Sequence, residues 1–409
     1  MYIIDSANEM PDHDYLMDRI KGIIDQGLAI TNVQNLYSKL LEAQNASARN
    51  LKSLYGIDNP NSSAQVLHYL ESVLTDDIVS ACVDDTGKWS SNKQAMTTLA
   101  MQGYQDAIDI LSYRKAKKYT ESANDILTYL NGDGKIRPKV TIGKTNRLNF
   151  KNPALMNIPK KLIWHIIAPR TEGNILMSVD IKNQEPWIMI NMLDITVLKE
   201  LLDVKGGLYE SVFHKIFDRD CVSIERDELK IAWNAMTYGA TIYGIKQICK
   251  HTDGESIFKF FNTIPQFKKY KNDCYKQMKK NQQTTETYFG TVLEADEFGP
   301  RLKRVLMDLP IQGTGADILA LLVKHFDSEI ESRGLEDYIS LYFSRHDELI
   351  IEVDRKFFEE HGENNVAAIL ADILEHRVDD WEPFQVKIGQ IIPGEDFFKV
   401  TSYAEDEEE

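Results

Sequence analysis

The chain has 409 residues, with 43% hydrophobic and 27% charged side chains, which is typical of a globular protein large enough for two or three compact units. No apolar run approaches the length of a membrane span, and the acidic N-terminus does not resemble a signal peptide. The net charge of −16 disfavours a nucleic-acid partner at first, but five of those charges belong to the acidic run 405–409, a solvated tail.

The four cysteines, Cys82, Cys221, Cys249 and Cys274, are widely spaced and form no CxxC pair. Neither a zinc site nor a disulfide framework is therefore indicated, and a reducing cytoplasm is the expected compartment. Basic residues cluster at 114–118 and at 268–280. Such runs are usually solvated helix faces, but they also leave nucleic-acid contact open.

The first third of the chain alternates helical patterns with short polar breaks. Helices are predicted over 20–30, 64–74, 93–111 and 112–130, and the run Asn131-Gly132-Asp133-Gly134 ends the last of them. From residue 135 the pattern changes to short strand-like pieces with many basic residues. The first third is therefore predicted to be a helical unit, and its sequence indicates no catalytic or binding motif.

The most informative strand is 175–180, a buried apolar run that ends on Asp180. A helix is expected to begin near Pro186. A carboxylate at the end of a buried strand is unfavourable unless a cation meets it. Asp180 is either the cap of that helix or a ligand for a cation, and this segment alone does not decide between them.

Residues 200–300 are predicted to be mostly helical, and one helix stands out over 226–239. Arg226, Lys230, Asn234 and Tyr238 recur every four residues and form one stripe on its surface. Two cations followed by an aromatic ring suit a nucleoside triphosphate, with the phosphates at one end and the base at the other. Taken alone, the helix is better interpreted as an exposed one with scattered charges.

After residue 300 a long helix is expected over 302–333, broken at Pro310, and a hairpin follows it. The hairpin strands 338–344 and 349–353 flank Arg345-His346-Asp347-Glu348, so two acids occupy a tip where Asn-Gly or Asp-Gly is usual. A helix over 357–377 and a strand over 385–392 complete the chain. Asp180 and Asp347, each at the end of a strand, are the minimum set for a pair of divalent cations.

Five motifs in order resemble those of family A DNA polymerases, the class of bacterial DNA polymerase one and many phage enzymes. The DxSxxE motif is matched by Asp180 and Glu185, RxxxKxxxxxxxYG by Arg226, Lys230, Tyr238 and Gly239, and HDE by His346-Asp347-Glu348. The TxRL…NIP motif is matched by Thr145, Arg147, Leu148 and Asn157-Ile158-Pro159, and PxQGTxAD by Pro310, Gln312-Gly313-Thr314, Ala316 and Asp317. The resemblance covers residues 50 to 400.

The resemblance implies an α+β right-hand polymerase fold, in which an antiparallel palm sheet carries helical fingers and a helical thumb. The expected units are an N-terminal helical extension (1–50), the thumb (51–140), the first part of the palm (141–200), the fingers (201–300), the second part of the palm (301–400) and the acidic tail (401–409). Because only about 50 residues precede the thumb, no proofreading exonuclease is expected in this chain.

The resemblance also implies roles for individual residues. Asp180, Asp347 and the Ile181 carbonyl are expected to hold two Mg²⁺ ions, with Mn²⁺ as a substitute, and Lys230 to donate a proton to pyrophosphate. The expected nucleotide-binding residues are Arg226, Lys230, Asn234, Tyr238, Glu185, Gln184 and Tyr209. The expected DNA-binding residues are Arg147, Asn157, Lys161, Arg304, Asp308, Gln312, His346 and Glu348. The implied partners are primer-template DNA and dNTPs, the acidic tail is a candidate contact for a replication protein, and no membrane is expected.

The chain departs from the family pattern at three positions. Asn234 replaces the usual aromatic residue, Asp308 replaces the usual asparagine, and Tyr209 lies near the place of a phosphate-binding histidine. The implied function is a template-directed DNA polymerase of phage type in a bacterial or phage-infected cell. The alternatives are a single-subunit RNA polymerase, which the bulky Glu185 disfavours, a catalytically inactive nucleic-acid-binding module, and a metal-dependent nuclease.

Overall fold

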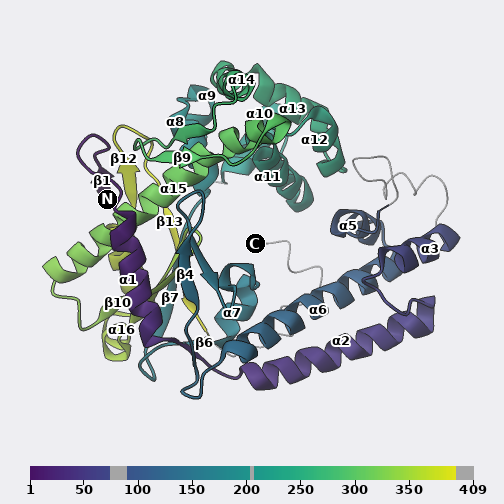
Figure 1. Cartoon of the computed structure of the whole chain (residues 1–409), viewed down its shortest axis with the longest axis horizontal. Helices are drawn as coiled ribbons and strands as arrows, with labels where there is room; N and C mark the ends of the chain where they lie inside the picture. The colour runs from purple at the N-terminus through teal and green to yellow at the C-terminus, as the bar shows by residue number, and fades with distance from the viewer. Residues whose placement is uncertain (74–89, 203–206, 393–409) are drawn as a thin grey trace.

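The computed structural model of the chain describes residues 1–73, 90–202 and 207–392 (Figure 1). The acidic tail and Cys82 lie outside these residues. At the centre is a four-stranded antiparallel sheet in the order β10-β11-β7-β13. Its strands are β7 (Ile175–Ile181), β10 (Ile339–Arg345), β11 (Glu348–Val353) and β13 (Val386–Ile391). The predicted strand at 175–180, the hairpin and the last strand are therefore confirmed.

Strands β7 and β11 are buried almost along their whole length, which explains why both read as continuous apolar runs. The hairpin between β10 and β11 turns over His346 and Asp347, and His346 adopts the left-handed conformation with φ of 55°. The register pairs Asp180 of β7 with Glu348 of β11 on one side and with Lys387 of β13 on the other. The pairing of strands distant in sequence thus brings the acids to one end of the sheet.

Helix α15 (Gly299–Ser332) packs within the core and continues through Pro310. The predicted break there is wrong, because neighbouring side chains satisfy the backbone that proline disturbs. The Leu306 carbonyl, which loses its usual N–H donor, accepts from the Cys274 thiol at 3.6 Å. By length and composition α15 could cross a membrane, but 83% of its most apolar window is buried inside the protein, as in a core helix.

A long helical arm projects from the body (Figure 1). It is formed by α2 (Val33–Tyr55) and α6 (Gln105–Tyr129), which pack along each other, with α3 (Ser63–Val73) and α5 (Lys93–Met101) near its outer end. The arm has a core of its own that includes Leu51, Leu70, Leu99 and Ile110. The expected boundary between two helices at 111/112 is wrong, because the turn occurs at Gly103, whose φ of 88° suits glycine, and Leu111 is buried within α6.

A helical cap lies over the opposite side of the body and consists of α10 (Leu208–Phe217), α11 (Ser223–Thr237), α12 (Ile242–Ile248), α13 (Gly254–Thr263) and α14 (Pro265–Lys279) (Figure 1). Aromatic rings fill its interior. The buried Trp233 of α11 meets the Tyr209 ring edge-on at 5.9 Å and the Phe261 ring at 4.8 Å between centroids. The mostly helical prediction for 200–300 is therefore confirmed over the described residues.

The first 30 residues belong to the body of the protein and differ from the helical extension expected for residues 1–50. Strand β1 (Tyr2–Ile4) pairs in parallel with β12 (His376–Val378), and β2 (Leu28–Ile30) lies between β3 (Lys135–Ile136) and β6 (Ile167–Ala168). Helix α1 (His13–Gln26) joins them and packs against α15. The expected boundary at residue 50 falls inside α2, because that helix continues to Tyr55.

Short elements connect these units. They are β4 (Lys139–Ile142), β5 (Leu148–Lys151), the 3₁₀ turn η2 (Leu155–Asn157), α7 (Lys160–Ile166), α8 (Gln184–Met192), α9 (Thr196–Lys199), β8 (Thr284–Glu286), β9 (Val292–Glu294), α16 (Arg355–His361) and α17 (Glu363–Leu374). The single helix expected over 357–377 is wrong. Gly362, with φ of 78°, separates two helices, and the last residues of that range form β12.

Tyr342 ties the N-terminal segment to the central sheet. Its buried hydroxyl accepts from the Ala29 N–H at 2.9 Å and donates to the Ala168 carbonyl at 2.7 Å, so it joins β10 to β2 and β6. We expect Tyr342→Phe to lower the free energy of unfolding by about 1–3 kcal/mol, because two buried backbone groups lose their partner. Urea denaturation measures this effect. Tyr338→Phe, at an exposed ring just before the same strand, is the control and should change stability by less than about 0.5 kcal/mol.

Candidate active site

Three carboxylates meet at one end of the central sheet. Asp180 lies at the end of β7, directly opposite Glu348, and Asp347 occupies the hairpin tip beside it. Burial, and then the charge of Asp180, raises the pKa of Asp347 to about 6. Burial also raises the pKa of Glu348, although the Ser178 hydroxyl donates to that carboxylate. Acids whose pKa values are raised by burial and mutual repulsion form a site that favours a cation.

The donor set fits Mg²⁺ better than a zinc-type ion. Within the described ranges, no group of three or more His, Cys, Asp or Glu side chains is arranged as metal ligands. Asp180 and Asp347 together supply two carboxylates, and Mg²⁺ typically binds one or two carboxylates while it keeps waters and substrate phosphates. The β7–β11 register, which pairs Asp180 with Glu348, brings the two aspartates to the same end of the sheet.

Two cations at this end of the sheet were not among the predicted site residues. The Lys160 ammonium is 2.8 Å from Asp180 Oδ2 and 3.5 Å from Glu348 Oε1. The buried Arg345 donates to the Ile158 carbonyl at 2.6 Å, and burial lowers its pKa. Only their positions next to motif residues could have indicated these two cations from the sequence. Lys160 directly follows the Asn-Ile-Pro run, and Arg345 directly precedes His346.

Glu185, in the first turn of α8, joins three separate segments. One carboxylate oxygen pairs with Arg147 Nη2 at 3.0 Å, and the other accepts from the Tyr238 hydroxyl. Burial, and then the charge of Glu185, raises the pKa of Tyr238 above its ordinary value. Three predicted site residues, spread over more than ninety positions of the sequence, are thus held together beside the acids.

The predicted stripe on α11 is present. Arg226, Lys230 and Asn234 are half-buried along one side of the helix, and Tyr238 follows at its C-terminal cap. Gly239 continues the turn with φ of 81°, which ends the helix and explains the Tyr-Gly pair. Arg226 is paired with Glu210 at 2.6 Å and with Asp227 at 2.9 Å. Lys230 has no hydrogen-bond or ion-pair partner among the described residues, so its charge is available to an anion.

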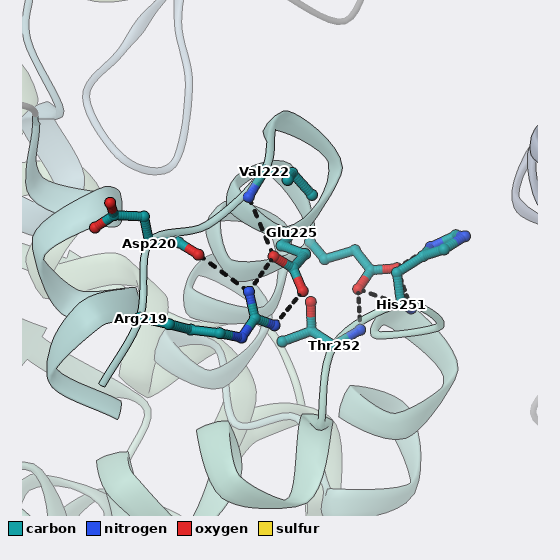
Figure 2. A network of polar contacts seen from close by, with 7 residues as sticks. Arg219, Asp220, Val222, Glu225, His251 and Thr252 are labelled. Carbon is teal, nitrogen blue, oxygen red and sulfur yellow. Dashed lines mark hydrogen bonds and ion pairs between the residues drawn. The ribbon is translucent and has the colours of Figure 1, made fainter. Parts of the chain in front are cut away.

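The N-terminal half of α11 is anchored by two carboxylates (Figure 2). Glu225 accepts from Arg219 Nη1 at 2.8 Å and from the Val222 backbone N–H at 3.1 Å. Glu228 accepts from the backbone N–H groups of 250–252, at 2.8 to 3.1 Å. Ser223 is the first helical residue, and Val222 precedes it as the N-cap. This network fixes α11 to the loop before α13.

Two predicted nucleotide-binding residues point into the protein. Gln184 is 4% exposed and contacts α15, where its Nε2 is 3.5 Å from the Gly315 carbonyl. Tyr209 is 3% exposed, and the Arg226 guanidinium lies 5.7 Å from its ring centroid. Their predicted nucleotide contacts are corrected: Gln184 packs against α15, and Tyr209 supports Arg226, because both side chains face the interior.

A cavity of about 610 Å³ opens beside Tyr238, between α12 and α15. Arg304 and Asp308, one helical turn apart on α15, line one wall, and Tyr238, Thr241 and Tyr243 line the other. Gln312 lies one turn further along and is half-buried. The buried Oδ1 of Asp308 has no hydrogen-bond partner among the described residues. Burial, and then the charge of Glu185, raises the pKa of Asp308 to about 6.

The remaining predicted DNA-binding residues lie outside the lining of this cavity. Asn157 is exposed at the end of η2, and His346 is exposed at the hairpin tip. Lys161, in α7, belongs to a basic cluster with Lys115 of α6 and Lys93 of α5. Burial, and then the charges of Lys161 and Lys93, lowers the pKa of Lys115 to about 8. Three segments, α5, α6 and α7, therefore bring positive charge close together.

The fold and this arrangement of acids and cations define a class, the right-hand polymerases. A solved structure described as the POL domain of Pol1 from M. smegmatis, in complex with DNA primer-template and dNTP, matches with a TM-score of 0.73 over 92% of this chain and 69% of that chain, at 23% identity.

The family model of DNA polymerase family A matches residues 30–389, and the chain belongs to this family. It is 25% identical to DNA polymerase I of Rhizobium leguminosarum over 66% of this chain and 28% of that protein. It is 22% identical to DNA polymerase I of Geobacillus stearothermophilus over 87% of this chain and 42% of that protein. The chain spans between about a quarter and half of the length of these curated relatives.

The raised pKa of Asp308 predicts a dependence of stability on pH. The folded protein holds this proton up to about pH 6, whereas the unfolded chain releases it near 3.8, so ionisation lowers stability as the pH rises through this window. We expect Asp308→Asn to raise the free energy of unfolding by about 1–2 kcal/mol at pH 7–8 and progressively less toward pH 4, allowing for partial exposure of the group.

Urea denaturation between pH 4.5 and 8 measures this difference. Asp18→Asn, at an exposed aspartate of α1, is the control and should change stability by less than about 0.5 kcal/mol. An Asp308→Asn effect that does not vary with pH would show that this carboxyl titrates normally.

Proposed function

We propose that this chain is a template-directed DNA polymerase that adds dNTPs to a primer 3′-hydroxyl. The observation that carries the proposal is the convergence of Asp180 and Asp347 at the end of the central sheet. Beside them, Tyr238 at the end of the α11 stripe donates a hydrogen bond to Glu185. An acid pair, an anion-binding helix face and an aromatic side chain are the parts that phosphoryl transfer from a nucleotide requires. The M. smegmatis structure, which holds primer-template DNA and dNTP, supports these substrates.

In this proposal the α11 stripe binds the nucleotide. Lys230, whose charge has no partner among the described residues, meets the triphosphate and protonates the departing pyrophosphate. Arg226, oriented by Glu210 and by the buried Tyr209 ring, supplies a second cation. Tyr238 stacks near the base, and Glu185 fills the space beside the 2′-carbon of the sugar. Asn234 faces the 3′ side of the sugar.

The helical arm, the helical cap and the sheet act as thumb, fingers and palm in this proposal. The basic cluster of Lys93, Lys115 and Lys161 faces DNA phosphates between thumb and palm, where neutralised phosphates release counterions. Arg147 and Gln312 contact the minor-groove side of the duplex, where acceptor positions vary little with sequence. Arg304, His346 and Glu348 line the primer end, and Asn157 is a further DNA contact.

Family A enzymes use divalent metal ions. We propose that Asp180 and Asp347, with the Ile181 carbonyl, hold two Mg²⁺ ions, or Mn²⁺ in their place. When bound, such ions acidify the primer hydroxyl and neutralise charge on the pyrophosphate. Cys221, Cys249 and Cys274 are free, which supports action in a reducing cytoplasm. The acidic tail remains a candidate contact for a replication protein.

Removal of one site carboxylate tests the proposal directly. We expect Asp180→Asn and Asp347→Asn each to slow single-turnover primer extension more than about a hundredfold, or ~2.7 kcal/mol of transition-state stabilisation. Binding of primer-template should stay within a few-fold of wild type, because these groups face the reacting phosphate. Rapid-quench extension and gel shift measure the two quantities.

Asp372→Asn, at an exposed aspartate of α17, is the control and should extend primers at the wild-type rate. A variant of Asp180 or Asp347 that keeps more than about a tenth of the wild-type rate would contradict the metal assignment. A wild-type chain that binds primer-template DNA but extends no primer with dNTPs or NTPs would favour the inactive binding module.

Sugar selection separates a DNA polymerase from an RNA polymerase. We expect Glu185→Ala to raise ribonucleotide incorporation relative to dNTP, because it opens space beside the 2′-carbon. The same change should also slow dNTP use, because Arg147 and Tyr238 lose their shared partner. Competition between dNTP and NTP on one primed DNA template measures the ratio.

Tyr238→Phe is the matched variant, because it removes the hydrogen bond to Glu185 and keeps the Glu185 side chain in place. It should slow dNTP use without raising ribonucleotide incorporation to the level of Glu185→Ala. An unchanged ratio in Glu185→Ala would place the sugar selection elsewhere and would favour the RNA polymerase alternative.

A further inference from the structure

Lys160 is the first residue of α7 and lies against the acid cluster of the candidate active site. Its ammonium is 2.8 Å from Asp180 Oδ2 and 3.5 Å from Glu348 Oε1. Its nitrogen also lies 4.5 Å from the centroid of the Trp164 ring, one helical turn further along α7. One lysine therefore bridges two carboxylates and covers an aromatic face.

The fold itself fixes this contact, which differs in this respect from an ion pair between two exposed side chains. The β7–β11 register places Asp180 directly opposite Glu348, so the two carboxylates present oxygens to the same position. Glu348 is 3% exposed and the Lys160 side chain is 31% exposed, so water screens the pair only in part. Trp164 and the start of α7 restrict where the ammonium can go.

Among the described residues, Lys160 is the cation that forms an ion pair with Asp180, one of the predicted metal ligands. Arg345, another nearby cation, donates to the Ile158 carbonyl instead. Asp347 and Glu348 add negative charge beside Asp180, and their pKa values are raised by burial. The ammonium therefore compensates a cluster whose carboxylates would otherwise repel one another.

We propose that Lys160 is a built-in counter-ion of the metal site, which holds Asp180 in the metal-free protein and leaves it when a divalent cation binds. This inference rests on the proposed function, since it takes Asp180 as a metal ligand. The carboxylate oxygen that accepts from an ammonium at 2.8 Å is a lone-pair donor that a metal ion also needs. Two cations on one oxygen also repel, so occupation by one disfavours the other.

The displacement has two consequences for the chain. Lys160 weakens the affinity of the site for metal, because each binding event breaks its contact with Asp180. Lys160 also links metal occupancy to α7, the helix that carries Lys161 and follows Asn157. Metal binding therefore frees a positive charge beside two residues proposed to contact DNA.

Titration of the full chain with Mn²⁺, without DNA or nucleotide, tests the inference. We expect Lys160→Met to bind Mn²⁺ about tenfold more tightly than wild type, because the competing ammonium is absent. Free Mn²⁺ is followed by electron paramagnetic resonance, and Mg²⁺ binding by calorimetry. Lys160→Arg, which keeps a cation, should stay within about threefold of wild type.

Lys182→Met is the matched control. Lys182 lies two residues beyond Asp180, is exposed, and its ammonium is 3.1 Å from Gln385 Oε1, away from the carboxylates. Its loss removes the same charge near the site and should change Mn²⁺ affinity by less than about twofold. If Lys160→Met and Lys182→Met gained equally in Mn²⁺ affinity, the effect would come from the change in net charge alone, and the inference would be overturned.

Thermal unfolding separates a counter-ion from a merely structural lysine. In metal-free buffer Lys160→Met should melt below wild type, because the carboxylates then repel without compensation, and saturating Mn²⁺ should remove most of that difference. A loss of stability that is equal with and without metal overturns the inference. Trp164 emission should shift on metal binding in wild type and be insensitive to metal in Lys160→Met.

Asp347→Asn in the same Mn²⁺ titration distinguishes failure of the inference from failure of the proposed function. If Asp347→Asn binds Mn²⁺ as wild type does, the metal site itself is wrongly assigned, and Lys160 cannot be its counter-ion. If Asp347→Asn weakens binding while Lys160→Met leaves it unchanged, the metal site stands and only the role of Lys160 is overturned.

Discussion

The antiparallel pairing of β7 with β11 is the constraint on which the site depends. Its register sets Asp180 opposite Glu348 and places Asp347 at the adjoining tip, so three carboxylates share one end of a buried sheet. Like charges in a poorly hydrated place are unstable without compensation. Two groups from different segments supply this compensation: the Lys160 ammonium pairs with Asp180, and the Ser178 hydroxyl donates to Glu348. Arg345 adds a buried positive charge near the hairpin tip.

The second constraint is the position of α11 relative to these acids. The helix belongs to the cap, whose aromatic interior around Trp233 holds it from behind. Glu225 and Glu228 fix its N-terminal half to backbone N–H groups, and the Tyr238 hydroxyl ties its end to Glu185. A helix held at both ends presents Lys230 and Asn234 in a defined direction.

The surroundings of the three residues that depart from the family pattern explain what each side chain does. Asp308 lies in the wall of the cavity beside Tyr238, where burial favours its protonated form, and a protonated carboxyl can donate as the usual asparagine does. Tyr209 does not replace a phosphate-binding side chain, because it is buried beneath Arg226 and supports that cation instead. Asn234 leaves the stripe without an aromatic face and places a half-buried polar side chain there instead.

The sequence alone determined the features that depend on local pattern. An apolar run ending on an acid predicted β7 and Asp180, two strand-like runs predicted the hairpin and Asp347, and a four-residue spacing predicted the α11 stripe. Only the tertiary structure decided which side chains turn inward and which groups compensate the acids. Gln184 and Tyr209 proved buried, Lys160 reached Asp180, and Pro310 stayed within α15 because Cys274 supplies a donor to Leu306. The physical reason is that such contacts join residues far apart in the chain, and a partner brought by another segment leaves no periodic trace in the sequence.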